Sequence, residues 1–155
     1  MTSHIAQLNI GRFCYPTDDP RMATFMANLD RINALAERSD GFVWRLKDES
    51  NNATAIRPAS EPTMAVNLSV WESVEALERF VWATVHKQFY NRKDDWFEKR
   101  AAPHFVMWPI PSRHIPDLEE AMGRLAHLTA HGDSDSAFGW SYLAHIKLWM
   151  SRKCG

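Results

Sequence analysis

The sequence has few cysteines, almost no net charge and no long hydrophobic run. Its two cysteines, Cys14 and Cys154, lie near opposite ends of the 155 residues. They form neither a metal-binding spacing nor the disulfide framework of a small secreted protein. The formal net charge is −1, which provides no global field favouring nucleic acid or an acidic membrane. No apolar run approaches the roughly 20 residues that span a bilayer, and no basic region followed by an apolar stretch marks a signal peptide. We therefore expect a cytoplasmic protein that binds neither nucleic acid nor membrane.

Several catalytic motifs are also missing. The sequence contains no glycine-rich phosphate-binding loop and no serine nucleophile elbow. His127 and His131 stand four residues apart, a spacing that can bind a metal on a helix, but no third ligand follows at a recognisable distance. A solvated helix end is the simpler interpretation, and we expect no metal site.

The composition is that of one globular domain with many aromatic residues. Hydrophobic residues make up 45% and charged residues 24%, and 155 residues suit a single domain covering 1–155. Seven Trp, eight Phe and three Tyr together make 12% of the chain. This aromatic content predicts either a bulky core or an aromatic-lined cavity.

Residues 64–97 are the central unit of the chain. The run from Met64 to Trp71 is apolar and β-rich, which predicts a strand. Ser73 then suits a helix N-cap, because its hydroxyl can accept a hydrogen bond from the first turn. From Val74 the apolar period changes from two residues to about 3.6, which predicts an amphipathic helix. Its expected inner face is Val74, Leu77, Phe80, Val81 and Val85, and its expected outer face is Glu75, Glu78 and Arg79. The same helix carries Trp82 and His86, so candidate functional side chains are densest here.

The N-terminal half predicts two strands that flank a helix. In residues 4–13, Ala6, Leu8 and Ile10 share one face, and Gln7, Asn9 and Gly11 share a polar face that could meet solvent or line a cavity. A helix is expected from Pro20, after an Asp19 N-cap, to about Ser39. Gly41 suits its left-handed C-terminal cap. In residues 42–47, alternation places Phe42, Trp44 and Leu46 on one face of a second strand. Residues 48–61 are expected to form a loop.

The C-terminal half predicts another strand and helix. Residues 104–110 form the strand, and Pro109 indicates a strand end or an edge because proline cannot donate to the ladder. A helix opening at Pro116-Asp117 and ending near His131 has Leu118, Ala121, Met122, Leu125 and Leu128 on its inner side. A second helical stretch is expected over 94–100, and a short fifth strand with an apolar tail over 137–150.

The resulting order, β-α-β-β-α-β followed by a helix and a short strand, is the α+β ferredoxin-like pattern with a C-terminal extension. We expect an antiparallel sheet with helices on one face. The other face would carry large aromatic residues, which a monomer cannot leave wet. Pairing two such sheets across a two-fold axis would bury it, so a homodimer is expected.

Several short motifs resemble known proteins. The run from Val70 to Leu77 (VWESVEAL), with the later His86 and Trp96, resembles the dimeric α/β-barrel superfamily of antibiotic-biosynthesis-type monooxygenases. The whole chain is more similar to a family of that fold known only as a domain of unknown function. That resemblance rests on AQLNI, DDPRM, GFVWRL, NLSVWES, HIP and the EEA helix, and it covers roughly residues 4–142. It implies the dimeric α/β-barrel fold without specifying an activity, because the superfamily includes cofactor-independent oxygenases, haem-degrading enzymes, isomerases and proteins without known catalysis.

The resemblance and the residues together suggest a site. The haem-degrading branch uses an Asn on the first strand and a Trp and a His on the second helix. Asn9 and His86 stand in comparable places, whereas Phe80 falls at the simplest alignment for the Trp, with Trp82 two residues later. We predict Asn9 and His86 as catalytic residues. The predicted substrate-binding residues are Trp44, Asn67, Trp71, Phe80, Trp82 and Trp108. Each has a structural alternative: His86 could bond a loop carbonyl, Asn9 could face water, and the tryptophans, Trp96 included, could be core residues.

Three functions remain open. The first is a monooxygenase-like or related enzyme, possibly of secondary metabolism, that acts on a small apolar or aromatic molecule between sheet and helices. It would use no cofactor. The second is a haem-binding or haem-modifying protein with His86 as ligand. The third is a non-catalytic ligand-binding or structural dimer.

Overall fold

The computed structural model describes residues 3–15, 19–47, 64–83 and 104–142. The elements are β1 (Ser3–Arg12), η1 (Pro20–Met22), α1 (Ala23–Glu37), β2 (Phe42–Arg45), β3 (Met64–Trp71), α2 (Val74–Ala83), β4 (Phe105–Pro111), α4 (Leu118–His131) and η3 (Trp140–Tyr142). The predicted loop 48–61, the helical stretch 94–100 and the tail beyond 142 lie outside the described residues.

The four strands form one antiparallel sheet in the order β2-β3-β1-β4. This order confirms the predicted ferredoxin-like α+β fold, in which β1 and β3 are the central strands. Pro109 lies opposite Ile5 on the outer strand β4, which confirms the predicted edge position. The strand nevertheless continues past Pro109 to Pro111.

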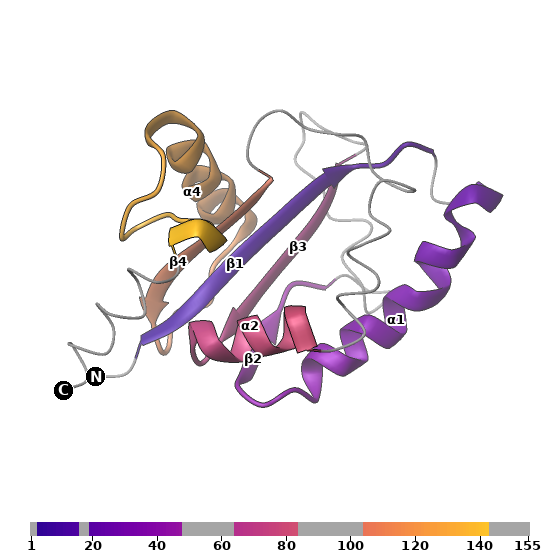
Figure 1. Cartoon of the computed structure of the whole chain (residues 1–155), viewed down its shortest axis with the longest axis horizontal. Coiled ribbons are helices and arrows are strands. Elements are labelled where there is room, and N and C mark those ends of the chain that lie inside the picture. Colours follow the sequence, from indigo (N-terminus) through magenta and orange to yellow (C-terminus); the bar gives the residue numbers. More distant parts are fainter. Residues whose placement is uncertain (1–2, 16–18, 48–63, 84–103, 143–155) are drawn as a thin grey trace.

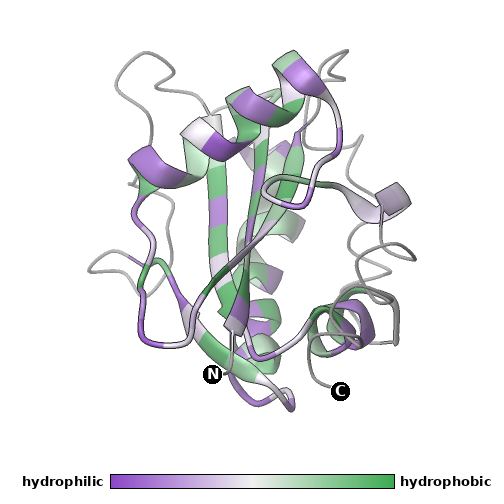
Figure 2. Cartoon of the chain, turned by 90° about the vertical axis from the view of Figure 1, so that its left-hand side faces the viewer, coloured by the Kyte–Doolittle hydropathy of each residue, from purple (hydrophilic) through white to green (hydrophobic). Residues whose placement is uncertain are grey.

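The two faces of the sheet are packed by different helices, so the prediction that helices cover one face only is wrong. One core cluster, the α4-side core, contains Ala6, Leu8, Ile10, Val66, Leu68, Val70, Val106, Trp108, Ile110, Ala121, Leu125, Leu128 and Ala137. The other, the α1/α2-side core, contains Ile5, Ile32, Ala36, Trp71, Val74, Ala76, Leu77, Phe80, Val81, Met107 and Phe138. In Figure 1, α2 lies in front of the strands and the fainter α4 lies farther from the viewer. Figure 2 shows hydrophobic and hydrophilic bands alternating along the strands, the pattern that divides side chains between two faces.

A bulge in β2 places its first residue, Phe42, and its third residue, Trp44, on opposite faces of the sheet. Phe42 lies opposite Trp71, whereas Trp44 lies opposite the next residue of β3, Val70. Two residues of β2 therefore span one residue of β3, and the extra residue shifts the alternation of side chains between the two faces. Phe42 packs edge-on against Trp71, with ring centroids 5.5 Å apart, while Trp44 packs against the α4-side core. The prediction that Phe42 and Trp44 share a face is wrong for this reason.

The predicted helix N-caps at Asp19 and Ser73 are confirmed. The Asp19 carboxylate accepts a hydrogen bond from Arg21 N at 2.8 Å, and Pro20 begins the first helical turn. The Ser73 hydroxyl accepts from Ala76 N at 3.1 Å at the start of α2. The helix expected to open at Pro116-Asp117 begins at Leu118 as α4, and Asp117 is its N-cap, with a carboxylate that accepts from Glu120 N at 2.8 Å. Gly41 has the predicted positive φ, 86°, but α1 ends at Glu37 with Arg38 as its C-cap, so Gly41 belongs to the turn before β2 and not to the helix end.

In the described part of 137–150 the predicted fifth strand is reduced to two isolated bridges, Ala137 with Ser134 and Phe138 with Met107. Phe138 and Met107 exchange two backbone hydrogen bonds, at 2.7 and 2.9 Å, on the outer side of β4. The chain then turns into η3 rather than continuing along the sheet. This bridge brings η3 to the side of the sheet on which α1 and α2 lie, because Phe138, Trp140 and Tyr142 all pack with the α1/α2-side core.

Candidate functional site

A cavity of about 420 Å³ lies between the sheet and the helices α1 and α2. Five polar residues of the strands line it and are here called the polar floor: Gln7, Asn9, Arg45, Asn67 and Ser69. Its apolar walls include Ile32, Ala36, Trp71, Leu77, Phe80, Val81, Phe105 and Trp140. Residues after α4 also line it, among them Asp133 and Ser141. This arrangement joins a polar base to mainly aromatic and aliphatic sides.

The pairing of β1, β2 and β3 brings the residues of the polar floor next to one another. Arg45 lies opposite Ser69, and Ser69 lies opposite Gln7, so these three residues form a row across β2, β3 and β1. Asn67 and Asn9 lie opposite each other two residues farther along. Because side chains alternate along a strand, both rows point to the same face of the sheet. The polar face predicted for residues 4–13 therefore lines a cavity.

Gln7 is the centre of a hydrogen-bonded network. Its Nε2 donates to Asn67 Oδ1 at 2.7 Å and to Ser69 Oγ at 2.7 Å. Both Gln7 and Ser69 are buried, with 5% and 6% of their surface exposed. Because Asn67 Oδ1 accepts from Gln7, the Asn67 amide nitrogen is left as a donor at the cavity. The network thus fixes which way the Asn67 amide is turned.

Ser69 presents a proton donor to the cavity. Its Oγ accepts hydrogen bonds from Gln7 Nε2 at 2.7 Å and from Trp71 Nε1 at 2.9 Å. An indole N–H can only donate, and a hydroxyl has two acceptor lone pairs and one proton. Both lone pairs are occupied, and no acceptor for the Ser69 proton lies among the described residues. The hydroxyl proton is therefore available to an oxygen atom placed in the cavity.

Arg45 brings a positive charge to the polar floor. Its side chain is 7% exposed, and its Nη2 lies 3.5 Å from Glu37 Oε1, which belongs to a more exposed side chain. A guanidinium remains protonated in proteins and presents its N–H donors in a fixed planar fork. The floor can therefore stabilise a negatively charged or strongly polar oxygen.

Two stacked aromatic pairs form part of the walls. The rings of Trp71 and Phe80 stack with centroids 5.2 Å apart and an interplanar angle of 27°. Those of Phe105 and Trp140 stack with centroids 5.1 Å apart and an angle of 11°. Beyond them, Tyr142 donates to Asp135 Oδ1 at 2.9 Å, and its pKa is raised by burial and, to a smaller extent, by this hydrogen bond. Flat apolar walls of this kind suit a flat apolar ligand.

The predicted site residues are only partly brought together. Asn9, Asn67, Trp71 and Phe80 line the cavity. Placing Trp44 and Trp108 in the same site is wrong, because both pack in the α4-side core on the opposite face of the sheet. His86, which the sequence predicts as a catalytic residue, lies outside the described residues, as do Trp96 and the side chain of Trp82.

Three cavity residues were not predicted as site residues. Gln7 and Ser69 alternate with Asn9 and Asn67, so the period-two pattern alone was a signal for them. Arg45 gave no such signal. Simple alternation places Arg45 and Trp44 on opposite faces of the sheet, but it does not tell which of the two faces lines the cavity. The bulge of β2 determines that Arg45 is on the cavity face.

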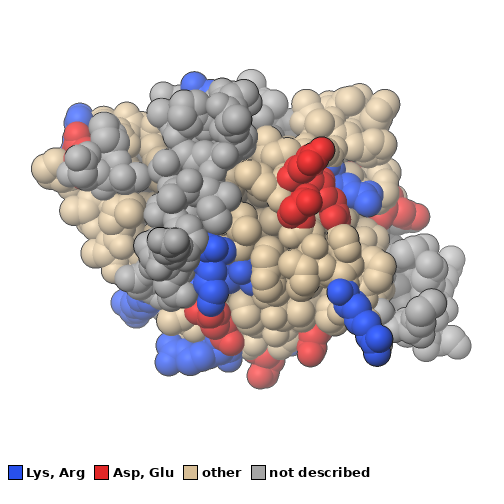
Figure 3. Space-filling model, turned by 180° about the vertical axis from the view of Figure 1, so that it is seen from behind, with Lys and Arg blue, Asp and Glu red and all other residues tan. Residues whose placement is uncertain are grey.

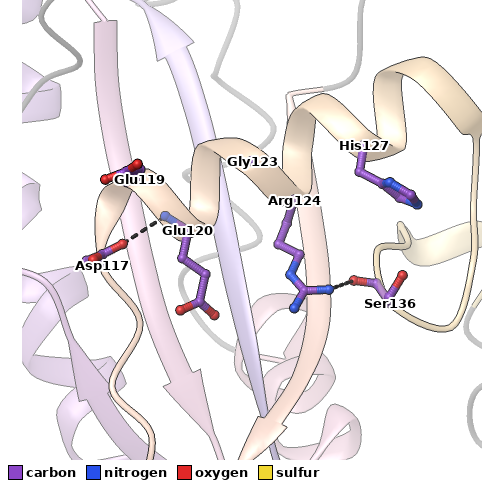
Figure 4. Close-up of a pocket in the computed structure, with 7 residues that line it drawn as sticks. All are labelled: Asp117, Glu119, Glu120, Gly123, Arg124, His127 and Ser136. Carbon is purple, nitrogen blue, oxygen red and sulfur yellow. Dashed lines mark hydrogen bonds between the residues drawn. The ribbon is translucent and has the colours of Figure 1, made fainter.

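A second depression is a surface groove along α4 (Figure 4). Its polar groups are occupied by structural contacts: Asp117 caps the helix, and Arg124 Nη1 donates to Ser136 O at 2.9 Å. The space-filling view in Figure 3 shows acidic and basic side chains interspersed over one face, without a large patch of one sign. Within the described ranges there is no cluster of three His, Cys, Asp or Glu suited to a metal, and no helix is long and apolar enough to cross a membrane. The cavity is accordingly the candidate site.

Comparison with known proteins identifies a family. The profile of a family described as "Domain of unknown function (DUF3291)" matches residues 4–153. No curated protein matches the chain significantly. The solved structure of SnoaB, a cofactor-independent oxygenase from Streptomyces nogalater, is 15% identical with a TM-score of 0.49, over 75% of this chain and 100% of that chain.

Two further structures are similar at the same level. A conserved protein from Methanosarcina mazei Go1 is 10% identical with a TM-score of 0.48, over 71% of this chain and 93% of that chain. A dabb family protein with a ferredoxin-like fold from Mesorhizobium loti is 13% identical with a TM-score of 0.45, over 75% and 99%.

Proposed function

We propose that this chain, which belongs to the family described as a domain of unknown function (DUF3291), binds a small, largely apolar or aromatic molecule in the cavity between its sheet and helices. The observation that carries this proposal is the polar floor beneath aromatic walls. A volume of about 420 Å³ is in the range of small-molecule sites. Apolar walls would supply affinity, and the few polar groups would fix the orientation of the ligand.

The proposed reaction is a cofactor-independent, monooxygenase-like transformation. Its support is the chemistry of the polar floor: Arg45, Ser69 and Asn67 place donors where negative charge on a substrate oxygen can be stabilised. Donors held in advance at such a position are a large source of catalysis. His86 remains the proposed general base, and its role stays a prediction because it lies outside the described residues.

The binding proposal can be tested by replacing Asn67, one of the hydrogen-bond donors that line the cavity. Asn67→Ala removes an amide that lines the cavity and bonds Gln7, so ligand affinity should fall while the fold remains. Asn28→Ala is the matched control, since Asn28 bonds Thr24 O at 2.8 Å on α1 and does not line the cavity. Affinity for a panel of bicyclic aromatic compounds should change only in the first variant. Equal effects in both variants would contradict the proposed site.

The catalytic proposal needs turnover. Oxygen consumption should be measured with phenolic and hydroquinone-type substrates that bind the cavity. A general base contributes typically 10²–10⁴-fold in rate, so His86→Ala should lose most turnover and retain binding. Binding without oxygen consumption or any product would favour the non-catalytic alternative. A Soret absorption band after incubation with haem, lost in His86→Ala, would favour the haem-binding alternative.

We also propose a homodimer in the cytoplasm. The sheet face that was expected to be buried against a second copy is instead packed by α4, and most of its strand residues are buried. The remaining support is the outer strand β2 and the half-buried apolar residues at that edge, Val43, Trp44 and Leu46. Light scattering at micromolar concentration should give twice the chain mass of 17.9 kDa, and a monomer mass would exclude the dimer.

A further inference from the structure

We infer that the ligand of this cavity carries an ionised oxygen group, a carboxylate or a phenolate, which binds to Arg45 and Ser69 side by side. This inference rests on the proposed ligand-binding role of the cavity and specifies the class of ligand. It follows from three observations on the polar floor.

The first observation is the placement of a cation next to a hydroxyl donor. Arg45 and Ser69 are directly opposite each other on β2 and β3, and both side chains line the cavity. Residues opposite each other on adjacent strands have Cβ atoms about 4.5–5.5 Å apart. That spacing allows one carboxylate or phenolate oxygen to receive a hydrogen bond from each.

The second observation is that Arg45 carries its charge in a largely enclosed place. Its side chain is 7% exposed, and its Nη2 lies 3.5 Å from Glu37 Oε1. Taking a charge out of water is costly unless opposite charge or strong acceptors meet it. An anionic oxygen in the cavity would add such a partner and would compete with Glu37.

The third observation is the fixed orientation of the Ser69 proton. Gln7 and Trp71 donate to both lone pairs of Ser69 Oγ, so the hydroxyl must donate rather than accept at the cavity. A negatively charged oxygen is the strongest acceptor for it. Gln7 and Trp71 are therefore positioning residues, which act on the ligand through Ser69.

Charged groups elsewhere in the cavity do not oppose an anion at this place. Among the described lining residues, the carboxylate of Asp133 comes from the segment after α4 and not from the strands that carry the polar floor. Its Oδ1 accepts from Gly139 N at 2.8 Å, and its Oδ2 accepts from Ser141 Oγ at 3.4 Å. The floor, where Arg45 lies, is thus the part of the cavity suited to negative charge.

The experiment compares ligands that share a ring system and differ in charge. Isothermal titration of the full chain would use 2-naphthoate as the carboxylate, 2-naphthol above its pKa as the phenolate, and 2-naphthamide as the neutral counterpart. One or both anions should bind at least tenfold more tightly than the amide. Arg45→Gln should weaken anion binding roughly tenfold to a hundredfold, the effect of a lost hydrogen bond to a charged group, and should leave amide binding nearly unchanged.

Further variants separate ligand recognition from folding. Arg45→Lys keeps the charge and should retain part of the preference for an anion. Glu37→Gln removes the competing carboxylate and should strengthen anion binding. The exposed Arg31→Gln on α1 is the control for a general loss of positive charge, and melting temperatures of all variants monitor folding.

The possible results are distinguishable. Equal binding of anions and amide, with unchanged affinity in Arg45→Gln, would overturn the anion inference and leave the proposed binding function standing. Weaker anion binding in Glu37→Gln would also overturn it. Failure of all three probes to bind would reject both the inference and the proposed cavity function.

Discussion

The imidazole Nε2 of His114 lies 2.6 Å from Oε1 of Glu120, which joins the segment after β4 to the first turn of α4. The other oxygen of the same carboxylate, Oε2, accepts a hydrogen bond from Trp108 Nε1 at 3.0 Å. Trp108 is fully buried in the α4-side core. One carboxylate therefore connects an exposed imidazole to a buried indole on the face of the sheet that packs against α4.

This relationship predicts unequal effects of two substitutions. Glu120→Ala leaves the buried Trp108 N–H without its acceptor, and should lower the free energy of unfolding by about 1–3 kcal/mol. Glu120→Gln keeps an acceptor oxygen and should cost less. His114→Ala removes only a half-exposed partner, so its effect should be below about 1 kcal/mol. Urea unfolding measures all three, and a larger loss in His114→Ala than in Glu120→Ala would contradict the assignment.

Two glycines should respond to alanine in opposite directions. Gly41 has φ +86°, and an added Cβ would lie next to Ala76 Cβ of α2. Gly41→Ala combines an unfavourable backbone conformation with a clash in the core, and should destabilise the fold by more than about 1 kcal/mol. Gly123 lies inside α4 with no atom within 4 Å of an added Cβ, so Gly123→Ala should stabilise by roughly 0.5–1 kcal/mol. Thermal unfolding should show a lower melting temperature for Gly41→Ala and a higher one for Gly123→Ala. A shift of both melting temperatures in the same direction would contradict the prediction.

The N-cap of α2 can be measured separately. The Ser73 hydroxyl accepts from Ala76 N at 3.1 Å, so Ser73→Ala should cost about 1 kcal/mol. Ser73→Thr retains the capping oxygen and serves as the matched control. An unchanged denaturation midpoint for Ser73→Ala would show that the cap does not contribute to stability.

The Asp19 cap predicts a pH dependence at the start of η1. Hydrogen bonds from the Arg21 side chain and backbone lower the pKa of Asp19 from 3.8 to about 2. Because the folded pKa is the lower one, the contribution to stability is present above about pH 4 and is lost as the pH falls toward 2. An NMR titration of the Asp19 carboxyl carbon should show this midpoint. Arg21→Ala removes the side-chain hydrogen bond, which is the largest cause of the lowered pKa, and should raise the midpoint. An unchanged midpoint would contradict the assignment.

Local sequence patterns determined the elements that carry the site. The caps at Asp19, Ser73 and Asp117 depend on residues within three positions of each helix start, so they could be predicted without tertiary information. The alternation of Gln7 and Asn9 with Leu8 likewise predicted a polar strand face. These features follow from backbone geometry over a few residues.

Tertiary structure decided which side chains share the cavity. A one-residue bulge between Phe42 and Trp44 places Arg45 on the same face as Ser69 and leaves Trp44 with Trp108 on the other face. The short run FVWR contains no residue that predicts this bulge. The position of α4 decided that this other face is core, because a helix stripe can pack on either side of a sheet. The sequence by itself determined the strands, the helix starts and the polar strand face, since these depend on near neighbours. The partners across the sheet were decided by strand register and helix packing, which arise from contacts between residues far apart in the chain.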